Sequence, residues 1–154
     1  MLALGGSRLR LIIESRLDAV GLVGKLVNTA CASAGVSRLD CYQAEVCVVE
    51  AVNNCVKHAY QGRPGNEVEV AISFSSGEMK FEIIDHGLPG DPAQLLLDRR
   101  DRLELDPKNV DSIPESGRGI AIIQAVMDGI QYHSSEGVNR LSMTKRIGPT
   151  EVAP

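Results

Sequence analysis

Hydrophobic residues in the first part of the chain follow a strand-like period and then a helical one. Arg8–Glu14 alternates polar and apolar residues, as expected of a strand. Ser15–Asp18 supplies side-chain oxygens that favour a helix start, and the helix predicted over Ala19–Ala34 ends at Gly35. A second helix is predicted from about Leu39 to Tyr60. Its apolar residues recur at helical spacing, at Val46, Val49, Val52 and Val56.

The second part of the chain predicts two β-hairpins. In the first, Val68–Phe74 and Met79–Ile83 alternate apolar and polar residues on either side of a short polar turn. In the second, Ile130–Ser134 and Leu141–Ile147 flank a turn that contains Gly137.

A long segment without a continuous core pattern separates the hairpins. It runs from Leu88 to Ser116, is rich in Pro, Asp and Arg, and contains a short helix predicted around Ala93–Arg102. A segment of this length inside a compact domain is usually functional or mobile. An apolar helix is then predicted from Ile120 to about Met127.

The order of these elements predicts an α/β two-layer sandwich, with a mixed, mostly antiparallel sheet and helices on one face. We expect a single domain over 8–147, because 154 residues can bury one substantial core and no internal repeat divides them. The tail 148–154 is expected to be frayed.

Composition narrows the functional classes. The 44% apolar and 23% charged residues are typical of a soluble globular protein. A net charge of −4 and an aromatic content of 3% argue against a nucleic-acid-binding protein, which needs basic and stacking surfaces. No apolar run reaches the ~18 residues of a transmembrane helix, and the N-terminus lacks the pattern of a signal peptide. A cytoplasmic protein is therefore expected.

The four cysteines favour a reducing compartment. Cys31, Cys41, Cys47 and Cys55 lack CxxC spacing and lie in apolar helical surroundings. This pattern disfavours a disulfide framework or a zinc site, and we interpret all four as buried free thiols.

The first motif with chemical potential lies in EAVNNCVKHAY, where Glu50, Asn54 and His58 are four residues apart and project from one helix face. A carboxylate can accept a proton from a hydroxyl or orient a water molecule. An amide oxygen is a ligand that Mg²⁺ accepts beside phosphate oxygens. The Glu50/Asn54 pair therefore suits metal-assisted phosphoryl transfer. Taken alone, the pair is better explained as a solvated helix face.

The second motif is Asp85-His86-Gly87, at the end of an apolar strand. A carboxylate there can accept a hydrogen bond from an exocyclic amine such as that of adenine, and Gly87 lets the backbone pass close to a flat ligand. A plain Asx turn that closes the strand is the alternative.

The third motif is Ser116–Gly119, directly before the apolar helix. Free N–H groups at a helix N-terminus form an anion site, glycines let a phosphate approach, and Arg118 can add a charge-assisted contact. A flexible loop end is the alternative.

The order of the three motifs is more informative than any one of them. A Glu/Asn pair on a helix, a strand that ends in Asp-x-Gly, a long loop and Gly-x-Gly at a helix start together match the layout of a nucleotide site. They would supply catalysis and metal binding, base recognition, a lid and a phosphate cradle.

With these motifs the chain resembles the GHKL ATPase superfamily (Bergerat or histidine kinase-like ATPase fold), and within it the anti-sigma factor serine/threonine kinase family. EAVNNCVKHAY resembles the N-box of that superfamily, IIDHGLPG its first glycine box and SGRGIAIIQAVMD its second. The resemblance extends over nearly the whole chain. Histidine kinases share the fold, but their catalytic domain normally follows a helix that carries the phosphoacceptor His.

The resemblance implies a role for each matching residue. Glu50 would be the general base and Asn54 the ligand of Mg²⁺. Asp85 would bind the adenine amine, with Gly87 beside the base. His86 is expected to be exposed and incidental.

The phosphates of ATP would be bound near the second glycine box. Gly117 and Gly119 would mark the two ends of the phosphate loop, with Arg118 between them. The segment 88–116 would be the ATP lid. His58 and Tyr60 are expected to serve packing only.

Two positions depart from the family pattern. Pro89 precedes Gly90 where the superfamily often continues Asp-x-Gly-x-Gly, a variation that also suits the anti-sigma group. A Gly-Thr pair commonly enters the last strand and helps to fix adenine through water, whereas here Gly137 is followed by Val138 and Asn139.

The resemblance implies an ATP- and Mg²⁺-dependent protein serine/threonine kinase that acts as an anti-sigma regulatory factor. Its partners would be a STAS-domain anti-anti-sigma protein, which it phosphorylates, and a sigma factor, which it sequesters. A homodimer is also implied. The alternative is a nucleotide-binding interaction module with little or no kinase activity. A nucleotide-free scaffold is a third and less attractive hypothesis.

Overall fold

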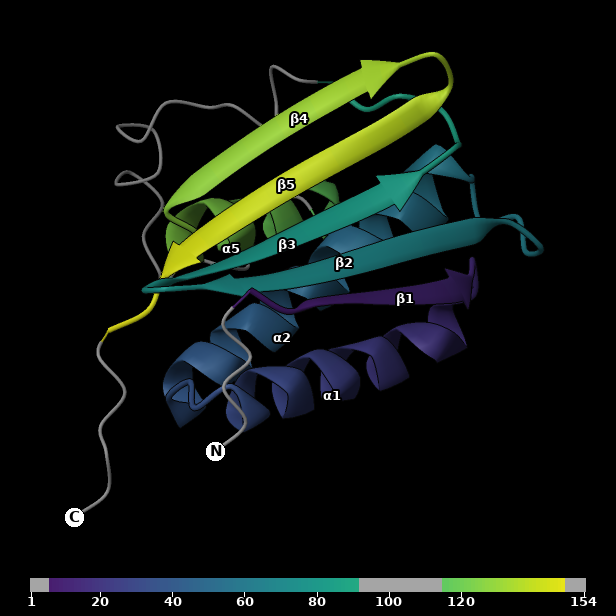
Figure 1. Ribbon diagram of the computed structural model, residues 1–154. Coiled ribbons are helices and arrows are strands. Elements are labelled where there is room, and N and C mark those ends of the chain that lie inside the picture. The colour runs from purple at the N-terminus through teal and green to yellow at the C-terminus, as the bar shows by residue number, and fades with distance from the viewer. Residues whose placement is uncertain (1–5, 92–114, 149–154) are drawn as a thin grey trace.

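The computed structural model describes residues 6–91 and 115–148, which form one five-stranded sheet with helices on a single face (Figure 1). The strands are β1 (Arg8–Glu14), β2 (Glu67–Ser75), β3 (Glu78–Asp85), β4 (Gly129–Ser135) and β5 (Val138–Arg146). The helices are α1 (Leu17–Ser33), α2 (Arg38–Asn54) and α5 (Glu115–Val126), and a short π-helix, η1 (Cys55–Ala59), continues α2. The predicted two-layer α/β sandwich is therefore confirmed.

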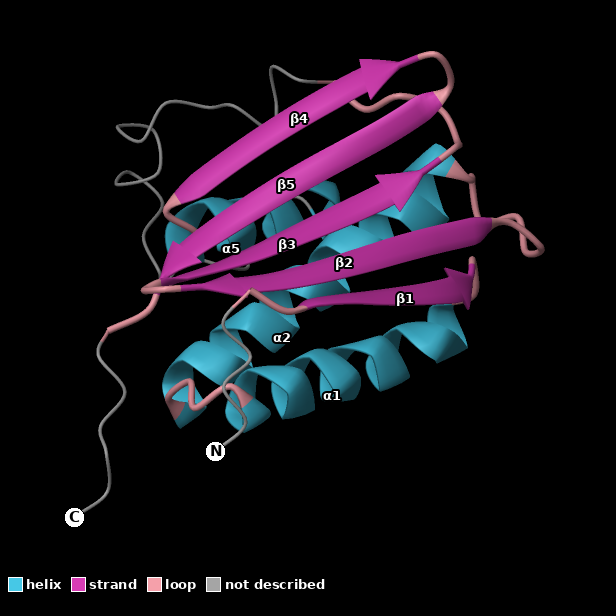
Figure 2. Ribbon diagram, in the orientation of Figure 1, coloured by secondary structure: helices cyan, strands magenta, loops and turns pink. Residues whose placement is uncertain are grey.

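The sheet is antiparallel at every described pairing, with strand order β1-β2-β3-β5-β4 (Figure 2). The expectation of a partly parallel sheet is therefore wrong. After β3 the chain crosses to α5 and β4, and β4 runs in the same direction as β3 (Figure 1). The two would form a parallel pair if they were neighbours, but β5 lies between them and pairs antiparallel to both.

The core lies between the sheet and the helices. Alternate residues of the two central strands face the helices and are buried: Val68, Val70, Ile72 and Phe74 in β2, and Met79, Phe81 and Ile83 in β3. Such alternation is the pattern of a sheet with one covered face.

Small residues form the buried face of α2. Ala44, Cys47, Val48 and Ala51 are buried, whereas Val46 and Val49 are only half-buried. The valine stripe predicted for this helix is thus confirmed only in part, since Val52 and Val56 are buried but Val46 and Val49 are not fully so.

All four cysteines are buried free thiols, as predicted. Burial raises the pKa of Cys31 and of Cys47 to about 12, with a smaller upward contribution at Cys31 from the neighbouring Cys41 and Asp40.

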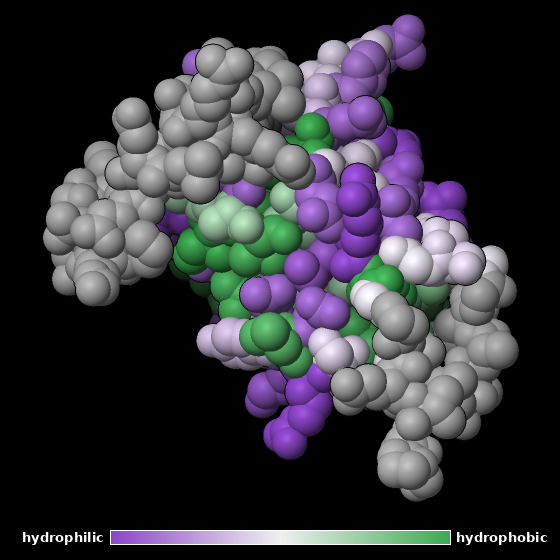
Figure 3. Space-filling view, turned by 90° about the vertical axis from the view of Figure 1, so that its left-hand side faces the viewer, coloured by the Kyte–Doolittle hydropathy of each residue, from purple (hydrophilic) through white to green (hydrophobic). Residues whose placement is uncertain are grey.

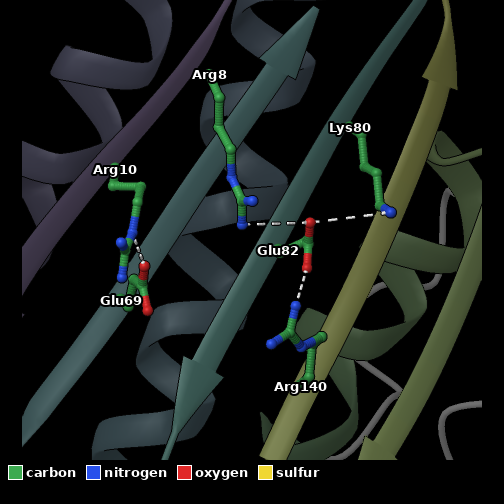
Figure 4. A network of polar contacts seen from close by, with 6 residues as sticks. All are labelled: Arg8, Arg10, Glu69, Lys80, Glu82 and Arg140. Carbon is green, nitrogen blue, oxygen red and sulfur yellow. Dashed lines mark hydrogen bonds and ion pairs between the residues drawn. The ribbon is translucent and has the colours of Figure 1, made fainter.

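The opposite face of the sheet is polar (Figure 4). Glu82 of β3 is 7% exposed and accepts a hydrogen bond of 2.5 Å from Arg140 Nη1 on β5. Arg8 and Lys80 lie within 3.9 Å and 3.8 Å of its carboxylate. A buried carboxylate needs such compensation. Because charged side chains cover this face, it does not require a second layer of helices.

Element boundaries agree with the predictions to within two residues, except at three helix ends and at β5, which begins at Val138 and not at Leu141. Ser15 does not cap α1, because its hydroxyl donates to the Arg63 carbonyl at 2.7 Å. The predicted helix from Leu39 to Tyr60 is α-helical only to Asn54. The helix expected from Ile120 is already present at Glu115. The helix predicted around Ala93–Arg102, most of the expected lid and most of the tail lie outside the described residues.

No described helix is long and apolar enough to cross a membrane.

At the end of the molecule viewed in Figure 3, hydrophobic side chains gather in areas interrupted by polar ones.

Two glycines of α1 give a matched test of the α1–α2 packing. A Cβ at Gly24 would lie 2.7 Å from Val49 Cγ2, whereas one at Gly21 would meet nothing within 4 Å. Gly21→Ala should raise the free energy of unfolding by about 0.5–1 kcal/mol, because Ala favours a helix. Gly24→Ala should lower it by about 1–3 kcal/mol through overpacking. Urea denaturation measures both, and an equal gain in the two variants would contradict this packing.

Candidate functional site

The predicted motifs meet where α2 passes into η1, beside the end of β3 and the start of α5. Cys55, the first residue of η1, contacts Asp85 at the end of β3. Gly87 lies against Ala59, the last residue of η1. Glu50 of α2 lies against Gly119 of α5. Segments that are far apart in the sequence thus form one site.

Asp85 is a buried carboxylate, 6% exposed, that accepts three hydrogen bonds. Its Oδ1 accepts from the Gly87 N–H at 2.9 Å and from Asn139 Nδ2 at 2.7 Å. Its Oδ2 accepts from Cys55 Sγ at 3.3 Å. The bond to Gly87 is the Asx turn expected as the simple explanation of the motif, but the two other donors come from separate elements.

The backbone that follows Asp85 is held at successive positions. The His86 N–H donates to Tyr60 Oη at 2.8 Å, and the Leu88 N–H donates to the Ala59 carbonyl at 2.8 Å. The Gly90 N–H donates to Tyr132 Oη at 2.7 Å. The entry to the predicted lid is thereby fixed on η1 and β4. His86 itself is exposed, as predicted.

Gly87 permits this arrangement because it has no side chain. A Cβ there would lie 2.3 Å from the Ala59 carbonyl oxygen and 2.5 Å from its carbon. Both are backbone atoms, so the contact cannot be relieved by a side-chain rotation. Any other residue would separate β3 from η1.

The π-helix breaks the line that Glu50, Asn54 and His58 were expected to form. Glu50 and Asn54 remain four residues apart on α2, and both are half-buried. His58 lies in η1, where the wider turn displaces it from that face, and it is exposed. The assignment of His58 to packing is therefore wrong. Tyr60 is buried and donates to the Glu67 carbonyl at 2.6 Å, in agreement with a structural role.

Gly119 brings α5 against Glu50. A Cβ at Gly119 would lie 2.5 Å from Glu50 Oε2 and 3.3 Å from Glu50 Cβ. The first four N–H groups of an α-helix have no partner within it. Gly117 and Arg118 belong to this donor end, whereas Gly119 is the fifth residue of α5, so its N–H falls within the helical ladder. The residues expected to form a loop before the helix are therefore part of the helix.

Burial and charge keep the groups around Asp85 protonated. The pKa of the Cys55 thiol is raised well above its usual value, first by burial and then by the negative charge of Asp85. Burial also raises the pKa of Tyr60, while its hydrogen bond from His86 opposes the shift. The Cys55 thiol is thus a donor to Asp85 at neutral pH.

The family model for the histidine kinase-like ATPase domain matches residues 13–145. The chain belongs to this family. The match extends over all the elements that form the site, from the end of β1 to β5.

Curated relatives place the chain near the serine-protein kinases. It is 30% identical over 146 residues to serine-protein kinase RsbW of Bacillus pumilus, across 91% of this chain and 86% of that protein. It is 30% identical over 148 residues to serine-protein kinase RsbW of Staphylococcus aureus, across 91% and 89%. The expected fold and the expected family of serine/threonine kinases are therefore confirmed.

Solved structures agree on the fold. The RsbU and RsbW domains of Rv1364c from Mycobacterium tuberculosis superpose with a TM-score of 0.65 at 17% identity, over 96% of this chain and 34% of that chain. The SiaB–SiaC complex from Pseudomonas aeruginosa gives a TM-score of 0.54 at 12% identity, over 89% of both chains.

The sequence motifs did not identify two residues of the site, Cys55 and Asn139. Both contact Asp85 through their side chains. Alternation in the last strand gives a signal for Asn139, since it shares a strand face with the core-facing Met143 and lies opposite Asp85 in the register. Cys55 has no such signal, because its position depends on the π-helix.

Gly87→Ala tests the contact between β3 and η1. The clash with the Ala59 backbone should lower the free energy of unfolding by about 1–3 kcal/mol. It should also weaken ATP binding about tenfold or more, ~1.4 kcal/mol, because Asp85 moves with Gly87. Denaturation and calorimetry measure the two effects.

Gly90→Ala is the matched control for this substitution. Its Cβ would lie 3.6 Å from Tyr132 Oη, an ordinary contact, so stability and affinity should change little. Equal behaviour of the two variants would refute the close approach at Gly87.

Proposed function

We propose that the chain is a cytoplasmic protein serine/threonine kinase that uses Mg·ATP to phosphorylate a STAS-type anti-anti-sigma partner, and that it sequesters a sigma factor. The observation that carries the proposal is the position of Glu50. Its half-buried carboxylate lies against Gly119 of α5, and its helix continues directly into η1, where Cys55 contacts Asp85, so that a base and a nucleotide would be brought together there.

Asp85 would recognise the adenine base. Its carboxylate is rigidly held, and it can accept a further hydrogen bond from the exocyclic amine. Gly87 would lie beside the base, because the backbone there carries no side chain. Buried, pre-positioned acceptors give strong discrimination between ligands.

Glu50 would act as the general base. It would accept the proton of the serine or threonine hydroxyl as the oxygen attacks the γ-phosphorus, while the bond between that phosphorus and the β,γ-bridging oxygen breaks and ADP leaves. Gly119 allows α5 to come close to this carboxylate and thereby limits its orientations. Proton transfer by a positioned side chain contributes about 10²–10⁴-fold to a rate.

Asn54 would hold Mg²⁺ together with phosphate oxygens of ATP. No group of three or more His, Cys, Asp or Glu side chains that could hold a metal occurs among the described residues, so a metal here would depend on the substrate. A neutral amide oxygen at the end of α2, one turn from Glu50, fits that requirement. When bound, Mg²⁺ supplies charge neutralisation at the phosphates.

The donor end of α5 would bind the phosphates. Gly117 and Arg118 lie at that end, where the direction of the N–H groups and the helix dipole favour an anion. The segment 88–116 would close over ATP as a lid. The relatives named serine-protein kinase support a protein hydroxyl as the acceptor, and the resemblance supports a homodimer.

Glu50→Gln tests the catalytic assignment. The amide keeps the shape but cannot accept the proton, so phosphoryl transfer should fall at least about 10²-fold. ATP affinity by calorimetry should stay within about threefold, ~0.6 kcal/mol. Transfer is measured with labelled ATP and the STAS proteins of the source organism.

Three outcomes of that experiment are decisive. Undiminished transfer in Glu50→Gln would overturn the role of Glu50. Binding of ATP by the wild-type protein without transfer to any STAS protein would support an interaction module instead of a kinase. No binding of ATP at all would overturn both.

Asn54→Ala and Asn53→Ala form a matched pair that tests the metal ligand. Both residues are half-buried on α2, but only Asn54 has the four-residue spacing to Glu50. Asn54→Ala should abolish most of the gain in ATP affinity that Mg²⁺ gives, whereas Asn53→Ala should retain it. Calorimetry with ATP, with and without Mg²⁺, measures this gain. In the absence of Mg²⁺ both variants should bind ATP like the wild type, and an equal loss of the gain in both would contradict the assignment.

A further inference from the structure

The carboxylate of Asp85 is held by a side chain and a thiol that no family motif assigns. Asn139 is 2% exposed and lies directly opposite Asp85 in the β3–β5 register. Cys55 is 8% exposed and approaches the carboxylate from the helical layer. Burial of a side-chain amide is unfavourable in free energy unless the amide is hydrogen-bonded. The hydrogen bonds of Asn139 therefore indicate its role.

The orientation of the Asn139 amide is determined by its neighbours. Its Oδ1 accepts from Ser134 Oγ at 2.7 Å. Its Nδ2 faces three acceptors: Asp85 Oδ1 at 2.7 Å, the Gly87 carbonyl at 2.9 Å and the Leu88 carbonyl at 3.4 Å. A flipped amide would point its oxygen at all three. Asn139 therefore ties the carboxylate to the backbone that follows it.

Cys55 acts on the other carboxylate oxygen. Its Sγ lies 3.3 Å from Asp85 Oδ2, and burial together with the charge of Asp85 raises the pKa of the thiol. The sulfur therefore carries its proton and donates.

Among the residues that the structure describes, these contacts leave the carboxylate with one open acceptor position. Two carboxylate oxygens offer about four lone-pair sites in total. The Gly87 N–H and Asn139 Nδ2 occupy both sites of Oδ1, and Cys55 occupies one site of Oδ2. The remaining site of Oδ2 can accept from an amine but repels a carbonyl oxygen.

We propose that Asn139 and Cys55 are positioning residues that set the preference of the site for a 6-aminopurine, by holding Asp85 in one orientation with a single acceptor position open. The inference rests on the proposed binding of adenine by Asp85. Without Asn139, Oδ1 gains a free site and the carboxylate can rotate or bind water, so a 6-amino group is no longer favoured over hydrogen or oxygen at that position.

Binding of ATP and of purine riboside triphosphate, which has hydrogen in place of the amine, tests the inference. Calorimetry should show the wild-type protein binding ATP about tenfold to hundredfold more tightly, as expected for a hydrogen bond to a charged group. Inosine triphosphate, with a carbonyl at that position, should bind more weakly still. Asn139→Leu, which keeps the volume but removes the donors, should reduce the ATP preference to below about threefold.

Cys55 offers a pair of variants that separates donation from packing. Cys55→Ala should reduce the preference, whereas Cys55→Ser, which retains a donor, should keep most of it. Ser142→Ala, on the outer face of β5, should leave the preference unchanged. Thermal denaturation identifies variants that fail to fold, and the Cys55 pair decides the test if Asn139→Leu is one of them.

The outcomes distinguish this inference from the proposed function. Equal binding of ATP and purine riboside triphosphate by the wild-type protein would overturn base recognition by Asp85, and the inference with it. If Asp85→Asn loses the wild-type preference for ATP, whereas Asn139→Leu and Cys55→Ala keep it, the inference alone is overturned. A variant that weakens both nucleotides equally would indicate a merely structural role and would also overturn it.

Discussion

The burial of one carboxylate constrains much of this fold. A carboxylate removed from water is unfavourable by several kcal/mol unless donors replace its hydration. Asp85 obtains those donors from η1, from the turn after β3 and from β5. Each of these elements must therefore reach the same point. The β3–β5 register, the path of the chain after Asp85 and the end of α2 all depend on this requirement.

The π-helix makes the requirement compatible with the geometry of α2. A regular α-helix through Ala59 would continue the spacing that sets Glu50 and Asn54 on one face. The wider turn of η1 changes direction directly after Asn54, so that Cys55 reaches Asp85 and the Ala59 carbonyl reaches the Leu88 N–H. Rare π-helical turns often occur at functional sites. Here the turn couples a helix face that carries Glu50 and Asn54 to a strand end that carries Asp85.

The sequence predicted those parts of the fold that follow a simple period. β1 has the predicted limits, and both hairpins lie where alternation places them. The break after Asn54 could not be predicted, because the apolar pattern continues through Val56 and a π-turn leaves no change of period in so short a segment. The early start of α5 was hidden for a related reason. Glycine disfavours a helix interior, so Gly117 and Gly119 indicated a loop, whereas close packing against Glu50 favours glycine within the helix at Gly119.

The site divides into two parts that depend on different elements. The proposed base recognition would depend on β3, β5 and η1, which are joined by the hydrogen bonds of Asp85 to Asn139 and Cys55. The position of Glu50 depends instead on the packing of α2 against α5, at a contact that is close because Gly119 has no side chain. If Glu50 is the base and Asp85 recognises adenine, as proposed, a change in α5 can alter catalysis and leave the base site intact. On that proposal, a kinase and a nucleotide-dependent interaction module would differ at the Glu50–α5 contact and not at the base site.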